Sequence, residues 1–189
     1  MARLFGFLLL ALSAPLFAAP PNILFFFADD QRYDTLSRAG HPIVQTPTID
    51  KLAADGVRFK NAFVTTSVCW VSRAVIFTGQ WARSHVQRNA VPQVRPDAAA
   101  TIYPVQLRQA GYTTAHFGKW HFKGPEGFKP EKQFDAFEQI GRSPYLKTMP
   151  DGSKKHETDI ICDRGIDFIK AQSKDKPFCM QLSFNAAHA

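Results

Sequence analysis

Cysteine is scarce in this sequence. Only Cys69, Cys162 and Cys179 occur in 189 residues, so at least one thiol has no partner within a monomer. Cys162 and Cys179 could pair and leave Cys69 over, although spacing alone does not decide this. There is no Cys-x-x-Cys and no Cys/His spacing of the kind that holds zinc, which argues against a zinc site.

Long apolar runs are also missing. The first apolar run, from Leu4 towards Phe17, falls short of the roughly 20 residues that span a bilayer. Arg3 precedes it, and Ala18-Ala19 and then Pro20-Pro21 follow it. The pattern predicts a cleaved secretory signal over residues 1–19, and hence an exported protein, periplasmic or extracellular, with no membrane attachment after cleavage. Phe17, three residues before a cut after Ala19, is not small, so the cut site stays open.

Basic runs are short, although the formal net charge is +7. No run exceeds Lys154-Lys155, and no nucleic-acid-binding motif is present, so nucleic acid is not expected as a partner. The excess charge favours other polyanions, among them sulfated glycans. With 45% hydrophobic and 13% aromatic residues, the chain has enough apolar material for the core of one domain.

Strand-like and helix-like segments alternate along the chain. The predicted strands are 22–28, an apolar run expected to be buried on both faces, and 57–64, 112–117 and 178–184. The predicted helices are 47–56, 69–78, 101–110 and 157–172, the first with Thr46 as N-cap. This order predicts an α/β domain with a mostly parallel central sheet flanked by helices, and ligands at the carboxyl ends of the strands. Residues 125–153, richer in Gly, Pro and charge, are expected to be a surface insertion.

A cysteine and an arginine lie one helical turn apart in Ser67-Val-Cys-Trp-Val-Ser-Arg73, which is closed by Thr78-Gly79. If a helix begins at Cys69, its free N–H groups, its dipole and the Arg73 guanidinium all favour an anion near that thiol. The alternative is that Cys69 is a small buried apolar residue and Arg73 a solvated charge.

Two adjacent carboxylates, Asp29 and Asp30, follow the first predicted strand. Their mutual repulsion is offset most directly by a hard divalent cation, Ca²⁺ or Mg²⁺, with further ligands from elsewhere in the chain. A pair of turn-capping aspartates is the alternative.

Lys119 and His121 follow the third predicted strand, and His188 follows the last. In an extended segment, alternate residues point to one side, so Lys119 and His121 are expected to face one pocket. There the lysine would attract an anionic oxygen and the histidine could give a proton to a leaving oxygen. A surface lysine and a structural histidine are the alternative, and the remaining histidines are interpreted as structural: His41, His85, His116 and His156.

Six motifs from Pro21 to Ala189 together resemble the sulfatase family, within the alkaline phosphatase superfamily. They are Pro21-Asn-Ile with Asp29-Asp30, Thr46-Pro-Thr-Ile-Asp50, the Cys69 motif ending in Thr78-Gly79, Ala110-Gly-Tyr-Thr113, Gly118-Lys-Trp-His121, and Pro177-Phe178 leading to His188. The Cys69 motif and the Gly-Lys-Trp-His segment at this spacing are the most specific.

The resemblance implies a fold, a reaction and a set of roles. It implies an alkaline phosphatase-like fold and oxidation of Cys69 to formylglycine by a maturation enzyme; the hydrated aldehyde would attack the sulfur of an aryl or carbohydrate sulfate ester and later expel sulfate. It assigns Asp29, Asp30 and residue 69 to a divalent metal. Arg73 would steady the residue 69 diol and the charge on the metal side. Lys119 and His121 would bind the sulfate and the modified residue, and His188 would assist at the leaving-group oxygen.

Two departures from the family pattern keep other interpretations open. Val71 stands where the family generally has Pro or Ala, and this bears on maturation of Cys69. The chain also stops at Ala189, so residues 20–189 are expected to be the N-terminal part of a catalytic domain, truncated before its later metal ligands. The alternatives are an inactive sulfatase-like fragment that binds sulfated glycans, and a phosphoryl-transferring relative, which Cys69 argues against.

Overall fold

The structure is a computed structural model that describes residues 19–87 and 93–188. The predicted signal over residues 1–19 lies, except for Ala19, outside the described residues. Within the described part, no helix is both long and apolar enough to cross a membrane.

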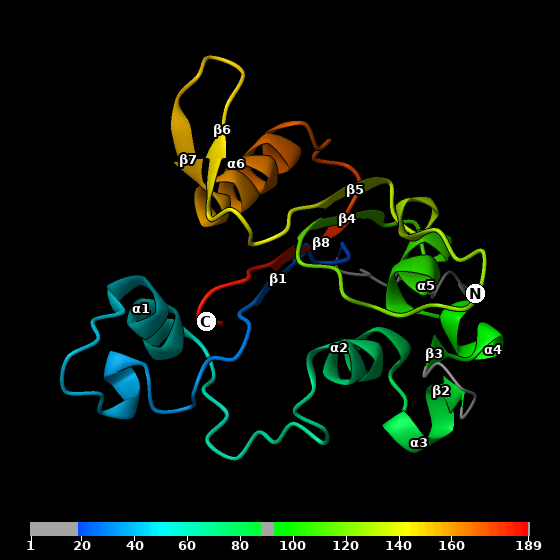
Figure 1. Cartoon of the computed structure of the whole chain (residues 1–189), viewed down its shortest axis with the longest axis horizontal. Coiled ribbons are helices and arrows are strands. Elements are labelled where there is room, and N and C mark those ends of the chain that lie inside the picture. The colour runs from blue at the N-terminus through cyan, green and yellow to red at the C-terminus, as the bar shows by residue number, and fades with distance from the viewer. Residues whose placement is uncertain (1–18, 88–92, 189) are drawn as a thin grey trace, which may run out of the picture.

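A parallel sheet of four strands forms the centre of the fold (Figure 1). Its order is β1-β8-β4-β5, with β1 at Ile23–Phe27, β8 at Phe178–Ser183, β4 at Thr113–Gly118 and β5 at Ala136–Gln139. All three pairings are parallel, with Phe27 opposite Ser183 and Gly118 opposite Ser183 on the other side. The predicted α/β class with a mostly parallel sheet is confirmed.

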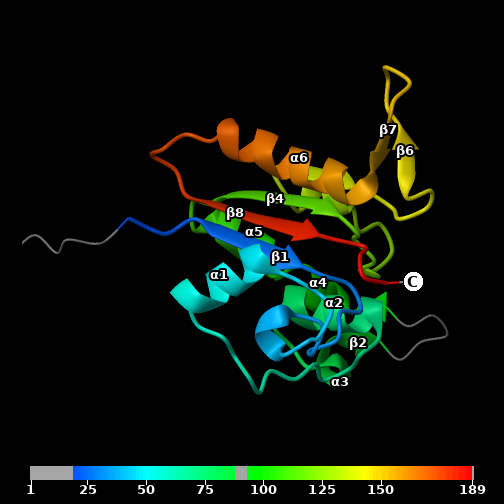
Figure 2. The ribbon, with the colours of Figure 1, turned by 90° about the vertical axis from the view of Figure 1, so that its left-hand side faces the viewer.

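Helices cover both faces of this sheet, as the side view in Figure 2 shows. α6 (Glu157–Lys170) lies on one face, and α2 (Cys69–Thr78) and α5 (Tyr103–Gln109) lie on the other. Alternation along β4 explains the two layers, since successive strand residues point to opposite faces. Ala115 and Phe117 join the core under α6, while His116 packs beside Phe77 of α2.

Shorter elements complete the described chain. They are η1 (Ser37–Ala39), α1 (Pro47–Asp55), α3 (Ala82–His85), β2 (Val86–Gln87), β3 (Gln93–Val94), α4 (Pro96–Ala99), η2 (Pro130–Lys132), β6 (Leu146–Thr148) and β7 (Lys154–His156). The predicted cap of α1 is confirmed in position, because Thr46 is the N-cap and Pro47 opens the helix. β6 and β7 pair as a separate antiparallel ribbon.

Three expectations about strands are wrong. No strand forms over residues 57–64; Val57, Phe59 and Phe63 are each at least 80% exposed, and alternation without a pairing partner does not make a strand. The first strand does form, but it is not buried on both faces: Phe26 is 53% exposed, and within the described residues β1 is an edge of the sheet. Residues 125–153 are not only a surface insertion, because they supply β5 to the central sheet.

Candidate functional site

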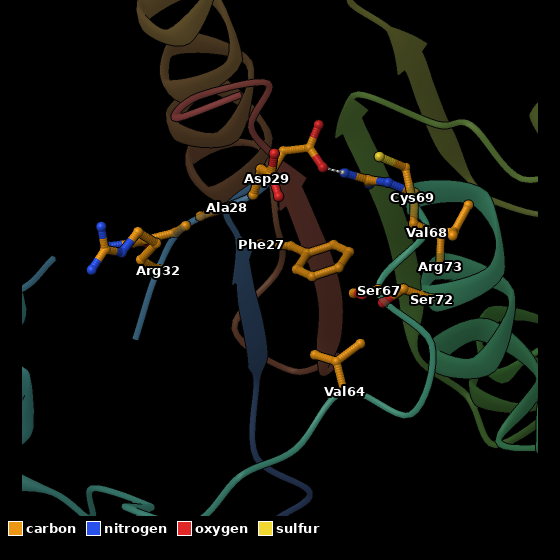
Figure 3. A pocket seen from close by; sticks show the side chains of 12 residues that line it. Phe27, Ala28, Asp29, Arg32, Val64, Ser67, Val68, Cys69, Ser72 and Arg73 are labelled. Atoms are coloured by element: carbon orange, nitrogen blue, oxygen red, sulfur yellow. Dashed lines mark ion pairs between the residues drawn. The ribbon is translucent and has the colours of Figure 1, made fainter. Parts of the chain in front are cut away.

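The carboxyl ends of β1, β4 and β8 meet the start of α2 at one edge of the sheet (Figures 1 and 3). A pocket of about 350 Å³ opens there, and Figure 3 shows the side chains around it. Its lining comes from the end of β1 and from the segment that leads into α2: Phe27, Ala28, Asp29, Asp30, Gln31, Arg32, Val64, Ser67, Val68, Cys69, Ser72 and Arg73. Three other predicted site residues follow the ends of neighbouring strands. Lys119 and His121 follow β4, and His188 follows β8.

Arg73 is the buried cation of this site, with a side chain only 1% exposed. Its Nη1 donates to the Ser183 hydroxyl at 2.7 Å and to the Lys119 carbonyl at 2.9 Å, and its guanidinium carbon lies 4.7 Å from the centre of the Phe27 ring. Its Nη2 is 3.5 Å from Asp29 Oδ1. Burial lowers the pKa of Arg73, and the charge of Asp29 opposes that shift. The alternative of a solvated Arg73 is therefore excluded.

Asp29 is held from three directions. Its carboxylate receives Lys119 Nζ and faces Arg73, and its backbone N–H donates to the Ala186 carbonyl at 2.9 Å. The side chain is 7% exposed, so its charge is largely removed from water and depends on these two cations. Asp29 is thus an ion-pair partner in this structure, and it remains able to share an oxygen with a bound cation.

Asp30 takes a different position. It is exposed, has a φ of +61°, and lines the same pocket as Asp29 and Cys69. Aspartate tolerates this left-handed backbone region better than most residues. The turn sends two successive carboxylates to one cavity, which fits the oxygen donors that Ca²⁺ or Mg²⁺ prefers.

Cys69 is the first residue of α2, where the sequence pattern places it. The N-cap, Val68, has no side-chain acceptor, so first-turn N–H groups of the helix are available to an anion. Ligand atoms of Cys69, Asp29 and His188 all lie within 4.8 Å of one another. Asp29 and Cys69, together with Asp30, fit part of the ligand set of a divalent cation.

Lys119 is brought into the site by a close approach between β4 and β8. Gly118 has a φ of +111°, and a Cβ there would lie 2.0 Å from the Ser183 carbonyl oxygen. The same oxygen accepts the Lys119 N–H at 2.8 Å. Glycine is needed before Lys119 because no other residue permits this contact.

His121 does not follow Lys119 along one extended segment, contrary to the expectation. Its φ is +48°, so the backbone turns after the buried Trp120, and His121 is exposed. Desolvation, followed by the charges of Lys119, Arg73 and Lys123, lowers the pKa of His121. His121 therefore lies near the cations of the site, although its backbone is not extended as the sequence pattern predicts.

Four residues at this edge escaped the sequence reasoning: Ser183, Asn185, Glu157 and Arg142. The Ser183 hydroxyl accepts a hydrogen bond from the Arg73 guanidinium, and Arg142 Nη1 lies 2.7 Å from His188 Nδ1. Asn185 and Glu157 are buried and hydrogen-bonded to each other. A buried serine or asparagine at a strand end carries no sequence signal of its own, since its role depends on partners far away in the chain.

Comparison with known proteins finds that the chain is similar to sulfatases. The Sulfatase family model matches residues 21–189. The chain is 34% identical over 173 residues to N-acetylglucosamine-6-O-sulfatase of Bacteroides thetaiotaomicron, covering 89% of this chain and 31% of that protein. It is 43% identical over 141 residues to Arylsulfatase A of Homo sapiens, covering 69% of this chain and 27% of that protein.

A solved structure is similar as well. It is that of a protein in complex with its substrate D-glucosamine-2-N,6-O-disulfate, with a TM-score of 0.72 and 33% identity, covering 89% of this chain and 35% of that one. The chain therefore spans about a third of the length of the relatives it matches.

Proposed function

This chain belongs to the sulfatase family, and from that premise we propose that it carries the nucleophile-bearing part of a sulfuric ester hydrolase. The observation that supports this most directly is the position of Cys69. It lies at the N-terminus of α2, in one pocket with Asp29, Asp30 and the buried Arg73. No single strand or helix supplies this set, so its assembly depends on the fold.

Residue 69 would be the reacting group. The formylglycine made from Cys69 by a maturation enzyme would supply the attacking oxygen, and a divalent cation held by Asp29, Asp30 and residue 69 would offset negative charge on it. Val71, which stands where the family usually has Pro or Ala, is one of the buried residues of α2 and is 9% exposed.

The chain's own cations would then bind the sulfate group. Lys119 and His121 would hold its oxygens. Arg73 would steady residue 69, and its guanidinium donates to the Ser183 hydroxyl and the Lys119 carbonyl. As the bond from sulfur to the ester oxygen breaks, negative charge grows on that oxygen, and His188 would donate a hydrogen bond to it. Preorganised charge of this kind favours the transition state over the ground state.

The substrate class follows from the relatives. The bacterial relative is named for a 6-O-sulfated N-acetylglucosamine, and the solved structure contains a disulfated glucosamine. We therefore favour a sulfated carbohydrate, mono- or polysaccharide, over a simple aryl sulfate. An exported protein, as the first 19 residues predict, would meet such substrates outside the cytoplasm.

The state of residue 69 tests this proposal. Peptide mass spectrometry on the full-length natural protein from its own host should show an aldehyde at position 69, and Cys69→Ala should lose sulfate release from a sulfated glucosamine. Cys162→Ala, on α6 outside the pocket, is the matched control and should keep both. An unmodified thiol throughout the population would contradict catalysis by this site.

The metal assignment has its own test. Calcium should raise the melting temperature of the full-length protein, because a ligand that binds only the folded state stabilises it. Asp30→Ala should abolish this rise, while Asp55→Ala, whose partner is Lys51 on α1, should keep it. An unchanged calcium response in Asp30→Ala would remove Asp30 from the ligand set.

A further inference from the structure

Arg142 and His188 form a contact that joins two strand ends of the site. Arg142 follows β5 and His188 follows β8, and Arg142 Nη1 lies 2.7 Å from His188 Nδ1. Both side chains are partly buried. A ring nitrogen of His188 also lies within 4.8 Å of Cys69 Sγ and of an Asp29 carboxylate oxygen.

The chemistry of the two groups fixes the direction of this hydrogen bond. A guanidinium has only donors and does not lose its proton in proteins, so Nδ1 of His188 must be the acceptor. Nδ1 therefore carries no hydrogen, and the ring proton is on Nε2. One tautomer of His188 is selected by its neighbour.

Buried groups hold both partners in place. The Asn185 side-chain amide donates to the Ile140 carbonyl at 3.0 Å and to Glu157 Oε2 at 2.9 Å. Asn185 is 3% exposed and Glu157 is fully buried. The backbone carbonyl of Asn185 in turn accepts the backbone N–H of His188 at 3.1 Å. The segment just before Arg142 and the turn that carries His188 are therefore tied to one fixed point.

In this arrangement His188 is unsuited to act as a metal ligand. With Nδ1 accepting from Arg142 and Nε2 bearing the hydrogen, the ring offers no lone pair to a cation, and the guanidinium charge repels one. The same arrangement gives Nε2 the chemistry of a hydrogen-bond donor. Close grouping of Asp29, Cys69 and His188 is thus a grouping of two metal-ligand candidates with one hydrogen-bond donor.

We propose that Arg142 is a positioning residue that holds His188 in the Nε2–H tautomer, as a hydrogen-bond donor to the reacting ester and not as a metal ligand. The catalytic part of this inference rests on the proposed sulfatase activity. The tautomer and the metal part do not, so they can be tested separately.

The tautomer is read by two-bond proton–nitrogen NMR on the full-length protein labelled with ¹⁵N-histidine. Wild type and Arg142→Lys, which still offers only donors, should show Nδ1 of His188 without a hydrogen. Arg142→Glu places an acceptor at the same point, so the hydrogen should move to Nδ1. An unchanged His188 pattern in a folded Arg142→Glu, or a protonated Nδ1 in wild type, overturns the proposal.

Kinetics separate positioning from substrate binding. Arg142→Glu should lower kcat on the order of 100-fold with little change in KM, as expected for a misaligned group. Arg142→Lys should recover most of kcat, and Arg83→Glu, an exposed charge reversal on α3, is the control and should match wild type. A raised KM with unchanged kcat in Arg142→Glu would make Arg142 a substrate-binding residue and overturn the proposal. An inactive wild type would instead contradict the proposed function and leave the NMR result to decide.

Calcium alone tests the metal part. His188→Gln should keep the calcium-dependent rise in melting temperature that Asp30→Ala loses. Loss of that rise in His188→Gln would identify His188 as a ligand and contradict the proposal.

Discussion

His116 is a titratable residue inside an aromatic cluster. Its ring stacks on Phe137 at 5.5 Å between centroids and meets Trp120 edge-on at 5.2 Å, and neither ring nitrogen has a hydrogen-bond partner. Burial, and then the charge of Arg73, lowers the pKa of His116 to about 3. Its role is apolar packing beneath the site, since a charged ring there would be strongly disfavoured.

The pH dependence of stability follows from this shift. Between pH 6.5 and about 3, His116 is protonated in the unfolded chain but stays neutral in the folded protein. The free energy of unfolding therefore falls as the pH drops through this range. The contribution approaches about 1.4 kcal/mol per pH unit. Urea unfolding at pH 7 and pH 5 should show that His116→Phe loses less stability on acidification than wild type. Equal losses in the two proteins would contradict the neutral, buried state of this ring.

At the scale of elements, the close approach of the paired strands β4 and β8 at their carboxyl ends positions the cationic side of the site. Gly118 allows the two strand ends to come close together. The Ser183 carbonyl accepts a hydrogen bond from the Lys119 N–H, and the Ser183 hydroxyl accepts one from the Arg73 guanidinium. One residue of β8 therefore organises two of the cations. A shift of either strand end would move the ion pairs of Asp29 with it.

A pair of glycine variants tests this close approach. Gly118→Ala should destabilise the protein by more than about 4 kcal/mol, because the new Cβ meets the Ser183 carbonyl and the backbone is left-handed. Gly127→Ala has a similar left-handed backbone, with φ of +75°, but open space around it, and should cost about 1–2 kcal/mol. Chemical unfolding measures both; equal costs would show that backbone strain alone, and not the close approach, requires Gly118.

At the scale of the whole molecule, large apolar side chains lie exposed in two segments of the described chain. Phe26 of the edge strand β1 is 53% exposed, and Phe59, Phe63 and Val57, in the loop between α1 and α2, are 80% exposed or more. An apolar strand at a sheet edge pairs readily with other chains.

We therefore expect residues 20–189 expressed alone to aggregate through the β1 side. Phe26→Lys should raise the soluble fraction and lower light scattering, because a charged edge residue opposes strand pairing. Tyr33→Lys, at a residue 88% exposed beyond the strand, is the control and should change little. If both substitutions act equally, net charge and not the strand edge governs solubility.

The sequence alone determined the parts of this protein that depend on local pattern. Apolar runs and caps were enough for β1, β4, β8, α2 and α6, and for the start of α1 at Thr46, because these signals involve neighbouring residues. Motif spacing was enough to identify the family and the position of Cys69 at a helix start. It failed over residues 57–64, where alternation had no partner strand, and over 125–153, where a composition typical of a loop concealed β5.

Only the tertiary structure decided which side chains of the site contact one another. The partners of Arg73 lie 46 and 110 residues further along the chain, at Lys119 and Ser183, and the contact of Arg142 with His188 spans 46 residues. The turn that exposes His121 is likewise set by the packing of Trp120 in the core. Hydrogen-bond partners and burial are properties of the assembled sheet, and residue types at fixed spacing do not encode them.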